Sequence, residues 1–355
     1  MNASEIDLRN ASPEGDSVLD RFHFLVNAPA LFNAVATAVE LGIFSHLSAQ
    51  RSATFEQIRE HVSIPPHQLR VLMQAVCTTG LLVRRDGVYA NSVVAEDLLA
   101  SDDDDSWSHI LLGWKEVYYP AFSRMTSAMR SGTNTALSDY PGDEPTLYQR
   151  LPRNPDLEAV FHRAMSAFTL RSVDELVERP EFSSVRHLLD IGGGDGTTSG
   201  KLSARHPEMK ITVFDIPSVS ELARDKTASR FEGRVELHPG DFFQDEFPRG
   251  ADSVLFSHVL EIFSAEQILG QLKKAYDALP SGGKVFIYGY NVSDDETRGI
   301  FSARLGLYFN VLASGQGMAY PAKDYETWLS QVGFDEVHTV SGLPYEHGLS
   351  MGRKP

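Results

Sequence analysis

The sequence predicts an α/β protein in which a doubly wound, mostly parallel sheet follows a helical N-terminal domain. From about residue 185 onward, buried strand patterns alternate with helical patterns, which is typical of a parallel sheet covered by helices on both faces. A glycine-rich loop follows the first of these strands, and helical patterns with one hairpin fill the first 100 residues. The 355 residues, of which 42% are hydrophobic, suffice for two to three domains.

The N-terminal part of the chain is predicted to hold a disordered tail over residues 1–18 and a helical domain over residues 19–100. The tail is polar and acidic and has no apolar run. In the domain, apolar residues recur at helical spacing in a long first helix. A second helix starts at Thr54, which forms a capping-box pattern with Gln57, and a third covers about 66–79.

A hairpin completes this domain. The segment LLVRRDGVYA contains two short strands around Asp86 and Gly87, which is a strong signal for a tight turn. Helices followed by a hairpin indicate a winged-helix-like domain, which serves either DNA binding or packing and dimerisation. The chain has 32 basic and 48 acidic residues, a formal charge of −16, and its third helix has one arginine and no lysine. Dimerisation through the apolar first helix, without nucleic acid, is therefore the prediction.

Residues 101–180 are predicted to form a helical linker and substrate-binding segment, which opens with the acidic, solvated loop SDDDDS. Residues 181–355 hold the predicted sheet. Its strands are expected at 187–191, 210–216, 234–241, 252–259 and 283–291, with a final antiparallel pair at 335–340 and 347–354. In such a sheet, ligands bind beyond the carboxyl ends of the parallel strands.

The loop after the first strand reads DIGGGDGTT. Gly192, Gly194 and Gly196 give the spacing G-x-G-x-G, which lets the backbone approach a ligand closely. A dinucleotide fingerprint needs glycine where this chain has Thr197, so an NAD-linked dehydrogenase is disfavoured. Asp190 at the strand end argues against an anionic diphosphate and for an ammonium or hydroxyl group.

Two further strand ends carry acidic residues. Asp215 ends the second strand, 19 residues after Gly196, where a carboxylate can accept two hydrogen bonds from a ribose diol. Asp241 and Phe242 follow the third strand, where a carboxylate beside an aromatic ring suits an adenine amine and one face of its ring. Three such signals at successive strand ends predict a nucleoside-type cofactor.

Four motifs together resemble one family. The segments LLDIGGGDG, VFDIPSV, PGDFF and SHVLEIF are similar to those of S-adenosylmethionine-dependent methyltransferases of the plant caffeate and bacterial secondary-metabolite O-methyltransferase type. The resemblance covers about residues 19–354, including an FxxxM segment and DYETWLSQVGF. It implies the Rossmann-like class I methyltransferase fold, S-adenosyl-L-methionine as cofactor and a homodimer. The cofactor-binding residues expected are Asp190, Gly192, Gly194, Asp215 on the ribose, Asp241 and Phe242 on adenine, Ser257 near the methionine carboxylate, and Phe263 in place of a tryptophan.

The family's usual catalytic stretch, VLHDW, is altered in this chain. Its histidine deprotonates the acceptor hydroxyl, whereas this chain reads VLEIF at 259–263. Glu261 stands in the position of the base, and Ile262 replaces the aspartate that orients it. The acidic residues that often flank the histidine correspond here to Tyr290 and to a residue of GQGMAY. The usual base constellation is therefore absent.

Three interpretations of this change remain open. Glu261 itself acts as base, if its apolar neighbours raise its pKa toward neutrality. Alternatively, the enzyme methylates an acidic carbon, next to a keto acid or ortho to a phenol, using Glu261 with His258, Tyr290 or His347. A third interpretation is a relative of this fold that has lost methyl transfer. His258, Glu261 and His347 would also suit a two-histidine, one-carboxylate metal site. A local hydrogen bond explains His258 more simply, and a surface position at a strand end explains His347, so no metal is predicted.

The acceptor pocket is expected to draw on the helical segment and one later stretch. Aromatic and methionine walls suit a flat aromatic substrate, although such residues at helical spacing are more often ordinary core. The resemblance implies walls made of Tyr118, Tyr119, Phe161, Met165 and Phe168, closed by Tyr308 and Met318. His162, with Arg163 beside it, is a candidate contact for a substrate carboxylate.

The predicted function is methyl transfer to a small aromatic or phenolic metabolite of amino- or keto-acid type in secondary metabolism, with carbon given at least the weight of oxygen as the acceptor atom. A winged-helix regulator that senses a nucleoside is the competing, non-enzymatic class. The single cysteine, Cys77, excludes an intramolecular disulfide. No uninterrupted apolar run approaches 18 residues, so a cytoplasmic protein without membrane contact is expected.

Overall fold

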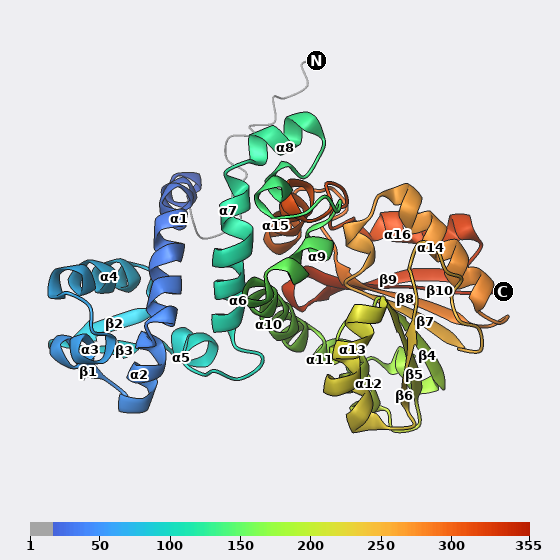
Figure 1. The fold of residues 1–355 in the computed structure, drawn as a ribbon, viewed down its shortest axis with the longest axis horizontal. Helices are drawn as coiled ribbons and strands as arrows, with labels where there is room; N and C mark the ends of the chain where they lie inside the picture. Colours follow the sequence, from blue (N-terminus) through green and yellow to red (C-terminus); the bar gives the residue numbers. More distant parts are fainter. Residues whose placement is uncertain (1–16) are drawn as a thin grey trace, which may run out of the picture. The chain divides into compact units, whose positions relative to one another are not determined.

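The computed structural model describes residues 17–355 and, at residues 218, 222, 225 and 226, the backbone alone (Figure 1). The chain divides into two compact units, Met1–Lys115 and Glu116–Pro355. This division falls inside the predicted linker and substrate-binding segment 101–180. The predicted disordered tail lies outside the described residues, except for Ser17 and Val18, where the first helix is capped and begins.

The first unit is helical with a small sheet. Its helices are α1 (Val18–Glu40), α2 (Ile43–Gln50), α3 (Phe55–Val62), α4 (Pro66–Thr78), α5 (Val93–Leu99) and α6 (Trp107–Gly113), and its strands are β1 (Ala53–Thr54), β2 (Leu82–Arg85) and β3 (Val88–Asn91). The capping box predicted at Thr54 is confirmed, because the Thr54 amide donates to Gln57 Oε1 at 2.8 Å and the Gln57 amide donates to the Thr54 hydroxyl at 3.3 Å. The predicted hairpin is confirmed too, with Asp86 and Gly87 both left-handed at φ 50° and 84°.

Helix α1 presents an unusually apolar surface. Several large apolar side chains near its start are more than half exposed: Val18, Leu19, Phe22, Phe24, Leu25 and Val26. Within residues 17–355, α1 is also the one helix that is long and apolar enough to cross a membrane. The sequence did not predict this, because no uninterrupted apolar run in it approaches 18 residues. Length and composition alone are weak grounds for such a role, because buried core helices and signal sequences share them.

The second unit contains the predicted doubly wound sheet. Its helices are α7 (Tyr119–Phe122), α8 (Met125–Ser131), α9 (Leu147–Arg150), α10 (Pro155–Ser172), α11 (Asp174–Val177), α12 (Thr197–Arg205), α13 (Pro217–Lys226), α14 (Ala265–Ala278), α15 (Ile300–Tyr308) and α16 (Ala322–Val332). Its strands are β4 (His187–Ile191), β5 (Lys210–Asp215), β6 (Val235–Pro239), β7 (Ser253–Ser257), β8 (Lys284–Tyr290), β9 (Asp335–Leu343) and β10 (His347–Arg353).

The strand order places the first strand, β4, at the centre of the parallel part. Among the described residues the order is β6-β5-β4-β7-β8-β10-β9. The five strands from β6 to β8 are parallel, and β10 is antiparallel to both of its neighbours. The order reverses at β4, so the crevice for a ligand is expected beyond its carboxyl end. The predicted α/β architecture with a final antiparallel pair is confirmed.

Alternate side chains of the strands serve the two faces of the sheet. Leu189, Val254 and Ile287 pack in one core with residues of α14 and α16, which lie together on that side (Figure 1). Leu188 and Leu255 pack in a second core with residues of α11 and α12. Because both faces are buried, the strands read as continuous apolar runs rather than as alternating ones.

Candidate active site

The glycine loop lies at the carboxyl end of β4 and has the backbone that glycine permits. Gly192, Gly194 and Gly196 have φ values of 68°, 60° and 77°, which residues with a Cβ rarely adopt. A Cβ on Gly192 would approach Val259 to 2.7 Å, whereas the space around the corresponding position of Gly194 is open. Gly192 therefore permits close packing against the end of β7, and Gly194 presents bare backbone to a ligand.

A cavity of about 160 Å³ adjoins this loop. It combines the loop, the end of β7 and the side of α10. The lining residues are His162, Met165, Ser166, Thr169, Gly192, Gly193, Gly194, Asp195, Thr197, Thr198, Val219, Ser257 and His258. Three predicted cofactor-binding residues, Gly192, Gly194 and Ser257, thus share one cavity with the candidate catalytic residue His258. The predicted acceptor residues Met165 and His162 line the same cavity.

Asp190 near the end of β4 and Asp215 at the end of β5 are the two carboxylates next to this loop. Asp190 is fully buried, and its Oδ2 accepts a 2.6 Å hydrogen bond from the Ser199 hydroxyl. Among the described residues no group donates to its other oxygen, Oδ1. Burial raises the pKa of Asp190 to about 6, against the effect of Ser199, and the nearby charge of Asp215 adds to the rise. Asp215 accepts hydrogen bonds from the amides of Gly194 at 2.9 Å and Ile216 at 2.8 Å.

The adenine end predicted at Asp241 and Phe242 has a turn geometry with an aromatic surface. Oδ1 of Asp241 accepts from the amides of Phe243 at 2.7 Å and Gln244 at 3.1 Å, so this carboxylate also stabilises the turn after β6. The Phe242 ring stacks on Phe263, with the ring centroids 5.0 Å apart. Phe263 therefore provides the flat apolar surface expected of the tryptophan that it replaces.

These features fit a nucleoside cofactor whose other end carries an ammonium group. The bare backbone at Gly194 gives space, and the orphaned Oδ1 of Asp190 is a buried acceptor of the kind that an ammonium group satisfies. Burial raises the pKa of Asp215, against the effect of its two amide donors. Its carboxylate keeps lone pairs for a diol, since each oxygen has one protein donor.

The most specific feature of the site is a pair of histidines, of which His347 is buried and His258 half-buried. Nε2 of His258, at the end of β7, lies 2.7 Å from Nε2 of His347, at the start of β10. The strand register explains the contact, because His347 is paired with Tyr290 across the β8–β10 ladder. His258 lines the cavity, whereas His347 is 1% exposed and lies behind it.

Hydrogen bonding assigns the tautomers of this pair. Nδ1 of His347 lies 2.7 Å from the carbonyl oxygen of Pro344, so Nδ1 carries the proton and Nε2 is an acceptor. His258 must then donate from Nε2, which leaves the basic lone pair on its Nδ1, 3.5 Å from the Ser257 hydroxyl. Burial, with a contribution from His347, holds the pKa of His258 well below its usual value. Burial also lowers the pKa of His347 to about 4.

Glu261 lies in a short helical turn after β7 and is 3% exposed. Its Oε1 accepts a 3.0 Å hydrogen bond from the amide of Tyr290. Burial raises its pKa to about 7, although its own amide and that of Tyr290 favour the charged form. Glu261 is thus a carboxylate poised near neutrality, as the apolar neighbours in its sequence predicted.

Aromatic side chains predicted to wall the acceptor site do meet. The rings of Tyr118 and Tyr308 stack with centroids 4.0 Å apart, and the Tyr118 hydroxyl lies 3.8 Å from Sδ of Met165. Phe168 stacks against Tyr290 at 5.7 Å and against His347 at 6.2 Å. These contacts connect the cavity beside the glycine loop to the histidine pair.

Other predicted acceptor residues lie at the margin of this group. Tyr119 is half-buried with its ring edge-on to Phe122, and Met318 packs beside the core under α14 and α16. Phe161 contacts Tyr148, which the sequence did not single out. His162 lines the cavity and lies 3.7 Å from Glu158, whereas Arg163 is exposed.

Arg304 on α15 is a second side chain that sequence reasoning missed. Its guanidinium carbon lies 5.3 Å from the centroid of the Tyr118 ring, and its charge opposes the rise that burial causes in the pKa of Tyr118 and Tyr290. Arg304 belongs to no motif, and its one sequence signal is a charge within the otherwise apolar helix IFSARLGLY. It places a positive charge among the phenols of the acceptor side.

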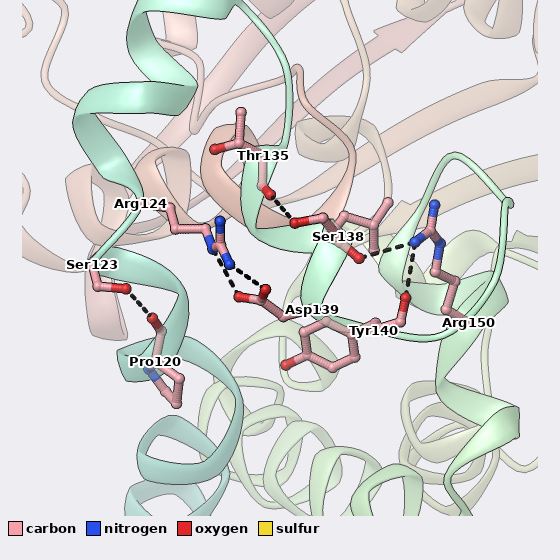
Figure 2. A network of polar contacts seen from close by, with 9 residues as sticks. Pro120, Ser123, Arg124, Thr135, Ser138, Asp139, Tyr140 and Arg150 are labelled. Atoms are coloured by element: carbon pink, nitrogen blue, oxygen red, sulfur yellow. Dashed lines mark hydrogen bonds and ion pairs between the residues drawn. The ribbon is translucent and has the colours of Figure 1, made fainter.

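Two arginines stabilise the segment between α8 and α9 (Figure 2). Arg124 pairs with Asp139, and Arg150 donates to the carbonyl oxygens of Leu137 at 2.9 Å and Tyr140 at 3.0 Å. The side-chain amide of Asn134 donates to the carbonyl oxygen of Leu312, just after α15, at 3.2 Å. These contacts stabilise the loop that precedes α9.

A metal site finds no support in this geometry. Within residues 17–355, no three histidine, cysteine, aspartate or glutamate side chains are arranged to hold a metal ion. His258 and His347 turn their Nε2 atoms toward each other, and Glu261 turns toward the Tyr290 amide. The arrangement is one of hydrogen-bonded bases.

Comparison with known proteins identifies the family of this chain. An O-methyltransferase domain matches residues 122–335, and an O-methyltransferase dimerisation domain matches residues 25–101. The chain is 32% identical over 327 residues to L-tyrosine C(3)-methyltransferase of Streptomyces lavendulae, which covers 91% of this chain and 89% of that protein. It is 30% identical over 322 residues to 3-hydroxy-5-methyl-1-naphthoate 3-O-methyltransferase of Streptomyces sahachiroi, covering 90% and 91% of the two chains.

A solved structure gives the same result. The S-adenosylmethionine-dependent methyltransferase SibL, in its apo form, superposes with a TM-score of 0.82 at 30% identity, covering 95% of this chain and 99% of that one. The class I methyltransferase fold implied by the resemblance is confirmed. With its glycine loop, strand-end aspartates and matching domains, the chain belongs to the O-methyltransferase family and is an S-adenosylmethionine-dependent methyltransferase.

Proposed function

We propose that this enzyme methylates a small phenolic aromatic acid at the ring carbon beside the hydroxyl, with methylation of that hydroxyl as the alternative. The observation that carries the proposal is the His258–His347 pair, whose basic nitrogen lies on His258 beside the cavity of the glycine loop. Two of the relatives support the acceptor class, because their names specify L-tyrosine and a hydroxynaphthoate.

His258 is proposed to take the proton of the acceptor hydroxyl at Nδ1. Its lowered pKa keeps it neutral at physiological pH, so that the lone pair on Nδ1 is available to accept a proton. Once it is protonated, its Nε2–H bond to His347 becomes charge-assisted, which stabilises the imidazolium at the moment when it forms. S-Adenosylmethionine supplies a sulfonium methyl that is already activated, so orientation and deprotonation of the acceptor are the contributions of the protein.

Glu261 is proposed as a second base, which favours carbon over oxygen as the acceptor atom. Methylation of a ring carbon needs a phenolate, whose electron pair forms the new carbon–carbon bond, and then loss of the ring proton. The oxygen regains its own proton, so one proton is released in all. Two separate bases suit these two transfers, and a carboxyl with a pKa of about 7 can accept the second proton near neutrality.

Arg304 is proposed to hold the acceptor carboxylate. It lies among phenols of the acceptor side, 5.3 Å from the Tyr118 ring, and α15 also carries Tyr308. A guanidinium binds a carboxylate through two parallel hydrogen bonds, so it can fix the orientation of a planar acid. Arg304 replaces the exposed Arg163 as the favoured partner for a carboxylate.

The enzyme is proposed to be a homodimer that works in the cytoplasm. The exposed apolar side chains of α1 provide a surface that a monomer would leave in water, and the dimerisation-domain match begins within this helix. A cytoplasmic location is in keeping with the single cysteine.

The test uses ring-deuterated L-tyrosine and ring-deuterated 4-hydroxybenzoate with S-adenosylmethionine, followed by mass spectrometry and NMR of the products. Methylation at carbon replaces one deuterium beside the hydroxyl, whereas methylation at oxygen keeps every deuterium. Loss of one deuterium supports the proposal, and full retention supports the alternative. If the protein binds S-adenosylhomocysteine but methylates no phenolic acid in a wider panel, the proposed acceptor class is wrong.

A further inference from the structure

The turn between β9 and β10 has an unusual backbone for its sequence. Tyr345 and Glu346 follow Pro344 and have φ values of 57° and 66°, two consecutive left-handed residues of which neither is glycine. Side chains disfavour this region, and such conformations persist where surrounding contacts determine them. His347, one member of the His258–His347 pair, follows Glu346 directly in the chain.

Glu346 supplies the contacts that hold this turn. Its Oε1 accepts from the amide of Ile300 at 2.7 Å, and its Oε2 accepts from the amide of Ser302 at 2.9 Å. These amides open helix α15, whose first N–H groups have no partner within the helix. The backbone carbonyl oxygen of Glu346 accepts a hydrogen bond from the amide of Asn291 at 2.9 Å, which connects the turn to the end of β8 as well.

The same turn touches both parts of the proposed site. The Tyr345 ring lies 5.3 Å from Phe168 and 5.7 Å from Phe301, the second residue of α15. The carbonyl of Pro344 sets the tautomer of His347. Three residues thus contact the helix that carries Arg304 and Tyr308, and also the histidine that orients the base.

We infer that Glu346 is a positioning residue for methyl transfer: by bonding the start of α15 it locks the 344–346 turn, so that the His258–His347 pair and the acceptor residues of α15 keep one relative placement. The inference rests on the proposed function, in which His258 is the base and α15 binds the acceptor. A helix cap alone would stabilise α15, whereas this link also transmits any displacement of α15 to His347.

The charge of Glu346 gives a readout that a purely structural cap would not. Burial lowers the pKa of His347, and the negative charge of Glu346 opposes that effect. Among the described residues, the other titratable groups in contact with His347 are His258, directly after β7, and Tyr288 and Tyr290 from β8. Backbone groups of Pro344 and Tyr345 also oppose the effect of burial. Removal of the Glu346 charge must therefore move the titration of the histidine pair to lower pH.

The test compares Glu346→Gln and Glu346→Asp with the matched control Glu208→Gln, an exposed carboxylate in a surface turn. The first readout is hydrogen exchange measured by mass spectrometry, which needs no turnover. Glu346→Gln is expected to speed exchange in peptides that cover 300–308 and 344–348, while Glu208→Gln leaves them unchanged. Glu346→Asp keeps the charge with a shorter reach and is expected to be intermediate.

The second readout is kinetic, with whichever phenolic acid the wild-type enzyme methylates. Glu346→Gln is expected to raise the acceptor KM and to lower kcat, so that kcat/KM falls by about tenfold to a hundredfold. Its affinity for S-adenosylhomocysteine is expected to be unchanged. The acid limb of its pH profile is expected at lower pH than that of the wild type. Glu346→Asp is expected to keep the wild-type acid limb.

The outcomes separate this inference from the proposed function. If the wild type methylates no phenolic acid, the proposed function fails, and local exchange in Glu346→Gln still decides whether the turn is locked to α15. If exchange at 300–308 and 344–348 matches the wild type, or if Glu346→Gln merely unfolds more easily with an unmoved acid limb, the inference is overturned. Failure of Glu346→Gln to fold leaves Glu346→Asp to decide through its exchange and its KM.

Discussion

Gly289 and Glu261 are packed against each other so closely that a Cβ on Gly289 would overlap Oε1 of the carboxylate. Gly289 lies in the interior of β8, next to Tyr290, whose amide holds the same oxygen at 3.0 Å. The space for Glu261 therefore depends on a missing side chain in the neighbouring strand. This pairing of a glycine with the residue in the base position leads to the first prediction.

Gly289→Ala is expected to displace the Glu261 carboxylate and to lower kcat by about tenfold or more, because a second base would leave its place. The overpacked site should also cost about 1–3 kcal/mol of folding free energy. Gly270→Ala is the control, since an added Cβ there meets no atom within 4 Å and lies in α14, where alanine favours the helix. Equal activity of both variants would show that Glu261 needs no fixed position.

Glu261→Gln removes the basicity of this side chain at constant volume and is expected to lower methyl transfer by about 10²–10⁴-fold, with little change in affinity for S-adenosylhomocysteine. The pKa of about 7 also determines in which direction the folding stability changes with pH. Between the ordinary carboxyl pKa and that value, the folded protein binds a proton that the unfolded chain releases, so stability falls as pH rises. Glu261→Gln should therefore gain Tm relative to the wild type at pH 8 but not at pH 5, and turnover within threefold of the wild type would make Glu261 structural.

His347→Asn tests the histidine pair. The variant loses the acceptor for Nε2 of His258 and is expected to lose about 10–10²-fold in kcat, while S-adenosylhomocysteine still binds in calorimetry. Both histidines have lowered pKa values, that of His347 being about 4. In the unfolded chain they take up protons near their ordinary pKa, so the wild type should lose stability as pH falls from about 6.5 toward 4. A variant with unaltered kcat and the same acid sensitivity would remove the pair from the mechanism.

Arg304→Gln tests the carboxylate contact through a pair of acceptors. For a phenolic acid such as L-tyrosine the KM is expected to rise about tenfold or more, because a charge-assisted hydrogen bond is lost. For tyramine, which has the same ring without the carboxylate, the two enzymes should differ little. Arg304→Lys, which keeps the charge without the planar fork, should be intermediate. A parallel loss for both acceptors would show that Arg304 only supports the Tyr118 ring.

Phe22→Asp tests the apolar surface of α1. The side chain is 56% exposed, so the substitution has little effect within one chain but places a charge in the proposed dimer interface. Light scattering at micromolar concentration is expected to show a dimer for the wild type and a monomer for the variant. Val93→Asp on α5, where the side chain is 88% exposed, is the control and should remain dimeric. A wild type that scatters as one 39.3 kDa chain would refute the dimer.

Local patterns predicted the parts of the fold that depend on neighbouring residues. The capping box at Thr54 and the Asp86-Gly87 turn are set by residues within a few positions of each other. The glycine loop was equally visible, since its spacing after a buried strand leaves few alternatives. Its contact with Asp215 follows because adjacent parallel strands end at the same edge of the sheet.

The acceptor side depended on contacts that sequence spacing does not encode. His258 and His347 were both candidate residues, but they are 89 positions apart in the sequence, and their contact requires the register of β10 against β8. Arg304 and Tyr148 carry no motif, and an ordinary helical or surface role fits their sequence equally well. The left-handed pair at Tyr345 and Glu346 is invisible in sequence because neither residue type favours that conformation.

The position of β10 inside the sheet determines which part of the site forms first when the enzyme refolds. β10 follows every other strand in the chain, yet it inserts between β8 and β9. The glycine loop and Asp215 come from consecutive strands and need short loop closures, whereas the histidine pair waits for this distant insertion. During refolding, the capacity to bind nucleoside should return before the capacity to transfer methyl groups.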